Sequence, residues 1–137
     1  MFGKKIMLGN TIQTIDEKHR IILPKFTGAE KGDKLVLFQE ENFFSIYSLE
    51  VILNQIHQEV SVNLESFLIL KDRNDQLSSN VLAIVDVDRY RRVLFSPYVC
   101  EKYQLNDKVF ISGAIDHINV FDGENEAKRL IKRRNGM

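Results

Sequence analysis

The sequence contains little cysteine and proline, no tryptophan and no long apolar run. Its one cysteine, Cys100, excludes an intrachain disulfide and agrees with a reducing cytosol. No apolar stretch approaches the roughly 20 residues that a membrane-spanning helix needs. The first ten residues are too short and too mixed in character for a signal peptide. We therefore expect a cytoplasmic protein with no membrane contact, formed by one domain or by two small halves that share a core.

Signatures of catalysis and of bound cofactors are also missing. His19, His57 and His117 are far apart and match no metal-ligand spacing, and no glycine-rich phosphate loop occurs. Asp86 and Asp88 would share one face of a strand and could hold a metal, but nothing else in the sequence completes such a site. We therefore expect no enzymatic activity, no cofactor and no metal, with a hydrolase built on these two aspartates as the enzymatic alternative.

The formal net charge is zero, but the charges are unevenly distributed. Residues 1–25 hold five Lys/Arg against two Asp/Glu (+3), residues 26–88 hold four against eleven (−7), and residues 89–137 hold ten against six (+4). Positive charge thus collects near both ends of the chain, with five basic residues among the last eleven. This asymmetry indicates a basic face that could meet an anionic partner despite the neutral total.

A duplicated unit organises the chain. Residues 14–24 (TIDEKHRIILP) correspond to residues 85–97 (VDVDRYRRVLFSP), and in both an aspartate precedes an arginine by four residues. The match continues from residues 31–37 to 105–111, with an offset that grows from 72 (88 minus 16) to 74 (107 minus 33). The second copy therefore carries two extra residues between its proline and its Asn-Asp turn. Self-similarity on this scale indicates duplication of one supersecondary unit.

The copies define three segments: a first repeat with a trailing helix (1–70), a polar connector (71–80) and a second repeat with a trailing basic helix (81–137). Alternation and turn residues predict strands, apolar residues at helical spacing predict helices, and Ser48 and Ser96 are candidate N-caps. The strands are expected at 4–8, 11–15, 20–23, 35–38, 43–47, 81–87, 93–95, 109–112 and 117–121, and the helices at 49–60, around 64–70, at 98–104 and after Asp122.

With both copies in view, the chain resembles the SpoVT-AbrB superfamily of swapped-hairpin transcription factors. The MraZ regulators, which carry two such motifs in one chain, are the most similar in layout. The family pattern is Asp, two residues, Gly, Arg, three residues, Pro. The first copy keeps Asp16, Arg20 and Pro24, and the second keeps Asp88 and Arg92 with its proline one position later. The resemblance spans roughly residues 7–134.

Two residues depart from that pattern at the same place in each copy. His19 and Arg91 stand where the family has glycine. Glycine there permits a positive φ in a tight turn, so we expect either backbone strain or a different turn shape. Asp16 and Asp88 are best interpreted as turn-forming side chains that accept backbone N–H bonds.

The charged turns suggest DNA contact. Arginine can grip phosphate bidentately or read guanine in the major groove, and phosphate contacts supply affinity while base contacts supply sequence choice. The resemblance implies that turn residues carry these contacts. The alternative is that the turns are solvated loops whose arginines pair internally with Asp16 and Asp88. The candidate DNA-binding residues are Lys18, His19, Arg20, Arg89, Arg91 and Arg92.

These observations predict an α+β, β-rich fold of two tandem AbrB-type repeats, which the resemblance implies interlock into a pseudo-two-fold, β-barrel-like core with helices outside. The expected function is a nucleoid-associated regulator that binds double-stranded promoter DNA and assembles into a homo-oligomer, as a ring or a dimer. The alternative is a protein-interaction module or antitoxin-like partner without sequence-specific DNA binding, which the acidic middle segment favours.

Overall fold

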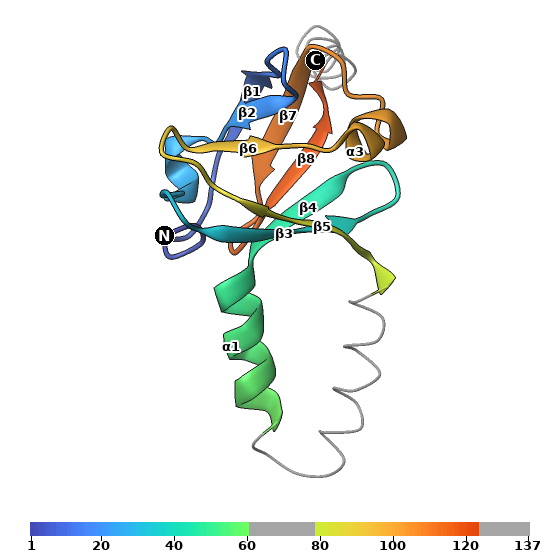
Figure 1. Ribbon diagram of the computed structural model, residues 1–137. Helices are drawn as coiled ribbons and strands as arrows, with labels where there is room; N and C mark the ends of the chain where they lie inside the picture. The colour runs from blue at the N-terminus through green and yellow to red at the C-terminus, as the bar shows by residue number, and fades with distance from the viewer. Residues whose placement is uncertain (61–78, 124–137) are drawn as a thin grey trace, which may run out of the picture.

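The computed structural model describes residues 1–60 and 79–123, and in them the protein is a β-rich α+β structure (Figure 1). One antiparallel sheet has six strands, and two further strands form a separate ribbon. The described elements are β1 (Asn10–Thr14), β2 (Arg20–Ile22), η1 (Lys25–Thr27), β3 (Lys34–Gln39), β4 (Phe44–Ser48), α1 (Leu49–Val60), β5 (Val81–Asp86), β6 (Arg92–Leu94), α3 (Pro97–Lys102), β7 (Lys108–Gly113) and β8 (Ile118–Asp122).

The strand order of the large sheet, β1-β7-β8-β4-β3-β5, is symmetric about its centre. Each half supplies a hairpin, β3–β4 or β7–β8, and the two hairpins meet where β4 pairs with β8. The first strand of each half then pairs with the hairpin of the other half, since β1 lies beside β7 and β5 lies beside β3. The two halves thus complete each other's sheet, which makes them one structural unit.

The ribbon of β2 and β6 runs across the curved sheet (Figure 1). Ile21 and Val93 face inward and are about 1% exposed. They join one core with residues from both halves, among them Leu37, Phe44 and Ile111. Burial of this apolar surface is the main force that holds the ribbon against the sheet.

The two copies differ after the ribbon. In the first, η1 is a single 3-10 turn that ends at Gly28, whose φ is 71°. In the second, α3 is a six-residue α-helix whose N-cap, Ser96, accepts a hydrogen bond from the Val99 N–H, with Pro97 at its first position. The two extra residues of the second copy therefore build a longer helix, and Ser96 is the cap that the sequence predicted.

Most predicted strands are present within one or two residues of the expected bounds. Ser48 also caps α1 as predicted, since its Oγ accepts from the Val51 N–H at 3.4 Å. The predicted strand at residues 4–8 is wrong: within it, Met7 alone forms a bridge, to Ile115. Gly9, with φ 131°, lies between this bridge and the start of β1. The helices predicted around 64–70 and after Asp122, and the basic C-terminus, lie outside the described residues.

Candidate nucleic-acid interface

The first turn, residues 16–20, leads into β2 and is organised by Asp16. The Asp16 Oδ1 accepts hydrogen bonds from the backbone N–H groups of Lys18 and Arg20, both at 2.9 Å. The Asp16 Oδ2 accepts from the Arg20 Nε at 2.8 Å. The chain also closes on itself, because the Arg20 carbonyl accepts from the Asp16 N–H at 2.9 Å. One carboxylate therefore fixes both the backbone of the turn and its arginine.

The second turn, residues 88–92, leads into β6 and repeats this arrangement. The Asp88 Oδ1 accepts from the N–H groups of Tyr90 at 2.8 Å and Arg92 at 2.9 Å. The Asp88 Oδ2 accepts from the Arg92 Nε at 2.7 Å. The prediction that the two aspartates form turns is confirmed, and so is the internal pairing of both arginines that the sequence left as the alternative.

The backbone of each turn contains a left-handed residue where the family pattern has glycine. His19 has φ 63° and Arg91 has φ 60°. A side chain in this conformation costs about 1–2 kcal/mol per residue. Of the two expected outcomes, the glycine-type turn shape is therefore retained and the backbone carries the strain.

Hydrogen bonds also join the turns to the opposite copy. The His19 carbonyl accepts from the Phe95 N–H at 2.9 Å, and the Arg91 carbonyl accepts from the Leu23 N–H at 2.8 Å. These bonds continue the β2–β6 pairing, in which Arg20 lies opposite Leu94 and Ile22 lies opposite Arg92. Because the strands are antiparallel, the two turns lie at opposite ends of the ribbon.

The solvent side of the ribbon combines two arginines with two apolar residues. Strand alternation places Arg20 and Ile22 on the same side of β2, and Arg92 and Leu94 on the same side of β6. Ile22 and Leu94 are 48% and 55% exposed, whereas the side chains of Arg20 and Arg92 are 27% and 26% exposed. We call these four residues the outer face.

Hydrogen bonding lowers the pKa of both turn aspartates. For Asp16 the largest cause is the bond from the Arg20 backbone N–H. For Asp88, desolvation by burial raises the pKa, but it is outweighed by bonds from the backbone and side chain of Arg92 and from the N–H of Tyr90. Both carboxylates are therefore ionised at neutral pH, and each partly balances the charge of its arginine.

The six predicted site residues form two groups of three, one at each end of the ribbon. Lys18, His19 and Arg89 are exposed, and Arg91 is half-buried. Arg20 and Arg92 are half-buried and paired with the aspartates. The cationic residues at the turn tips are thus available to a ligand, while the last arginine of each turn also has a structural role.

Sequence reasoning missed two residues beside the second turn. The Tyr90 ring, 55% exposed, has the Cζ atoms of Arg89 and Arg92 each 4.8 Å from its centroid. Lys31 lines the same hollow, although 57 residues separate it from Asp88 (88 minus 31). The flanking arginines could have drawn attention to Tyr90, but only the folded chain brings Lys31 to this place.

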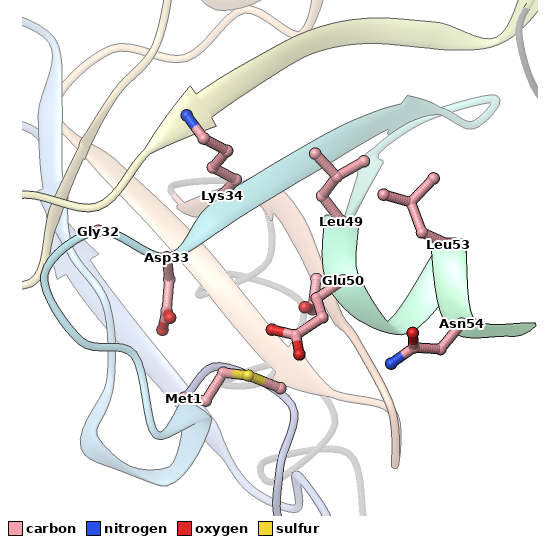
Figure 2. Close-up of a pocket in the computed structure, with 9 residues that line it drawn as sticks. Met1, Gly32, Asp33, Lys34, Leu49, Glu50, Leu53 and Asn54 are labelled. Atoms are coloured by element: carbon pink, nitrogen blue, oxygen red, sulfur yellow. The ribbon is translucent and has the colours of Figure 1, made fainter.

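A different hollow of about 430 Å³ lies between the start of α1 and the N-terminus (Figure 2). Figure 2 shows Asp33 and Glu50 extending toward Met1, whereas Lys34 points away from them. The Asp33 Oδ2 already accepts from the backbone N–H of Phe2 at 2.8 Å and of Glu30 at 2.9 Å. The carboxylate of Asp33 therefore holds the N-terminal segment in place.

The residues considered for chemistry have structural partners. Asp86 accepts from the Lys34 Nζ at 2.9 Å, and Asp88 is paired with Arg92. In the described part of the chain, no three His, Cys, Asp or Glu side chains gather closely enough to hold a metal ion. Cys100 is buried, and desolvation raises the pKa of its thiol. These residues are explained by the fold.

Comparison with known proteins gave no assignment: no protein-family model matches the chain, and no curated protein matches it. Within residues 1–60 and 79–123, no helix is both long and apolar enough to cross a membrane. The fold and the site together define a β-rich protein of two intertwined halves that presents a pair of equivalent, aspartate-organised turns.

Proposed function

We propose that this protein is a DNA-binding transcriptional regulator, nucleoid-associated in the cytoplasm, that contacts double-stranded promoter DNA through its two turns. The observation that carries the proposal is the equivalence of the turns: the same hydrogen bonds hold both, and they flank one ribbon whose outer face bears Arg20 and Arg92. A solvated loop has no need for such a constrained shape in two copies.

The size of the ribbon suits a DNA groove. A strand of three residues rises only about 7 Å from its first residue to its last. The two turns therefore start close together compared with the major groove, which is about 12 Å wide. The outer face between them offers Ile22 and Leu94, apolar side chains of the kind that contact a thymine methyl.

Pairing with an aspartate leaves each arginine able to bind DNA. A guanidinium carries five N–H donors, and the bond to Asp16 or Asp88 uses the one on Nε. The four donors on the Nη atoms are not used by that bond. Because the carboxylate fixes the guanidinium plane, less side-chain entropy is lost when the Nη atoms meet a phosphate or a guanine.

The topology supports the finer fold proposal. Strand exchange between the halves, with β1 beside β7 and β5 beside β3, is what two interlocked swapped-hairpin repeats would produce. We include in the proposal a pseudo-two-fold, barrel-like core and a homo-oligomer, either a ring or a dimer. Several weak turn contacts in one assembly would gain affinity through effective concentration.

A salt titration of duplex binding tests the proposal. The logarithm of the binding constant should fall linearly with the logarithm of salt concentration, and Arg20→Ala or Arg92→Ala should weaken binding clearly. Circular dichroism of both variants shows whether the fold is kept. Failure of the folded wild-type protein to bind any duplex at low salt would eliminate the proposal.

The alternative function is a protein-interaction module or antitoxin-like partner on the same scaffold. Two observations favour it: the carboxylates of Asp16 and Asp88 partly neutralise the arginines, and residues 26–88 carry a net charge of −7. Under this alternative, the protein would bind no duplex DNA at low salt. The variant Arg89→Ala would still bind the protein partner.

A further inference from the structure

The second turn borders an open hollow of about 440 Å³ that is lined in part by residues with cationic side chains. Lys31, Arg89 and Arg92 line it, together with the Tyr90 ring. Arg92 is held from two sides, by the Asp88 carboxylate at 2.7 Å and by the ring of Tyr90 at 4.8 Å. Arg89 lies over the same ring. Tyr90 therefore positions two guanidinium groups beside one hollow.

Lys31 reaches this hollow from the first half of the chain. Its loop is fixed to the end of β5, because the Gly32 N–H donates to the Val87 carbonyl and the Val87 N–H donates to the Asp33 carbonyl, both at 2.9 Å. Lys31 is exposed and forms no ion pair with any residue in the described ranges. Three residues with cationic side chains, from two segments of the chain, thus line the hollow together with Asp88.

The first turn has no equivalent of this group. At the offset of 72, Glu17 corresponds to Arg89 and Lys18 corresponds to Tyr90. At the offset of 74, Lys31 corresponds to Leu105, which is only 6% exposed. The scaffold is duplicated, but its cation-lined hollow occurs beside the second turn.

We propose that this hollow binds one backbone phosphate of the DNA and makes the second turn the main source of affinity. This inference rests on the proposed function and adds a subsite to it. A phosphate oxygen suits a hollow lined by two arginines and one lysine, because each of these side chains can donate a charge-assisted hydrogen bond to it. The first turn then contributes less to affinity and is freer to contact bases.

Neutral substitutions at matched exposed positions test this subsite. Lys31→Gln and Arg89→Gln each remove one positive charge from the hollow, and Lys18→Gln removes one from the first turn as the control. Binding to one duplex is measured as a function of salt. Each hollow variant should lower the magnitude of the log–log salt slope by up to about 0.9, the value for one complete phosphate contact, and weaken binding about tenfold at low salt. Lys18→Gln should change both by clearly less.

The phosphate itself is located by replacing single phosphates in the duplex with uncharged methylphosphonates. One replacement should weaken binding of the wild-type protein by clearly more than it weakens binding of Lys31→Gln, since that variant has already lost one of the phosphate's partners. Free inorganic phosphate, added at constant ionic strength, should compete only weakly with the duplex for this hollow, because the DNA makes further contacts elsewhere.

The outcomes separate the two proposals. If the wild-type protein binds DNA but Lys31→Gln, Arg89→Gln and Lys18→Gln all lower the slope equally, the subsite is refuted and the DNA-binding function stands. The subsite is also refuted if every methylphosphonate weakens binding of Lys31→Gln as much as it weakens binding of the wild-type protein. If the wild-type protein binds no duplex at all, the proposed function fails first.

Discussion

The two turns are equivalent in geometry but differ in charge. Residues 16–20 contain two acids and two bases, for a net charge of zero with His19 neutral, whereas residues 88–92 contain one acid and three arginines, for a net +2. Lys31 adds a further charge beside the second turn. The residues that set the turn shape are identical in the two copies, and the residues at the tips are not. The shared Asp-to-Arg fork therefore builds the turn, and under the proposed function the tip residues determine what the turn contacts.

Exchanging the charges at the matched positions Glu17 and Arg89 should have the largest effect. Arg89→Glu gives the second turn the acid of the first and should weaken duplex binding about 100-fold at low salt, because one contact is lost and a repulsion is added. Glu17→Arg should strengthen binding, by about tenfold. Fluorescence anisotropy at fixed low salt measures both. If both variants changed duplex affinity by the same small factor, the charge difference between the two turns would not matter for binding.

Removing the turn arginines should separate structure from binding. Arg20→Ala and Arg92→Ala break the same bond to an aspartate, so they should lower the melting temperature by similar small amounts. Arg92→Ala should weaken DNA binding about tenfold or more, and severalfold more than Arg20→Ala does. Arg20→Lys and Arg92→Lys, which keep the charge but lose the fork, are the matched controls. If the two alanine variants bound DNA with the same affinity, the two turns would contribute equally to binding.

Glycine at the left-handed positions should relieve strain equally in both turns. His19→Gly and Arg91→Gly should each raise the free energy of unfolding by up to about 1 kcal/mol, since removal of the left-handed cost is partly offset by the extra freedom of glycine in the unfolded chain. Urea denaturation measures the change. DNA affinity should fall more for Arg91→Gly, which removes a positive charge, than for His19→Gly. Destabilisation by both variants would show that the backbone is not strained there.

The smallest expected effect concerns acid pH. The pKa values of Asp16 and Asp88 are lowered in the folded state, so their stabilising contribution is complete above the unfolded-state pKa of about 3.9 and is lost as pH falls below it through the folded-state pKa. Denaturation midpoints at pH 5 and pH 3 should therefore differ less in Asp16→Asn and Asp88→Asn than in the wild-type protein. An unchanged difference would mean that neither carboxylate contributes.

Much of this fold could be read from the sequence because its signals are local. The alternation of apolar and polar residues predicted most strands, and Ser96-Pro97 predicted the start of α3. The duplicated aspartates predicted both turns. The strand predicted at residues 4–8 was wrong because an apolar pattern does not reveal that only Met7 finds a β-partner, Ile115. Backbone geometry overrode residue preference at His19 and Arg91, where the surrounding hydrogen bonds fix the left-handed conformation.

The candidate site was predictable only in part. The sequence identified the charged tips, but it left open whether Arg20 and Arg92 were free or paired, because that depends on side-chain geometry. Lys31 lines the hollow beside Tyr90 because hydrogen bonds hold its loop against Val87, the residue that follows β5. Contacts between residues so distant in sequence carry no periodic signal.

Titration of isotope-labelled protein with a short duplex, followed by backbone amide NMR, locates the surface that meets DNA. We expect the shifted amides to cluster at residues 16–20 and 88–92, with larger changes in the second turn and at Lys31. Shifts confined to the opposite side of the large sheet, or no shifts at low salt, would contradict DNA recognition by the two turns.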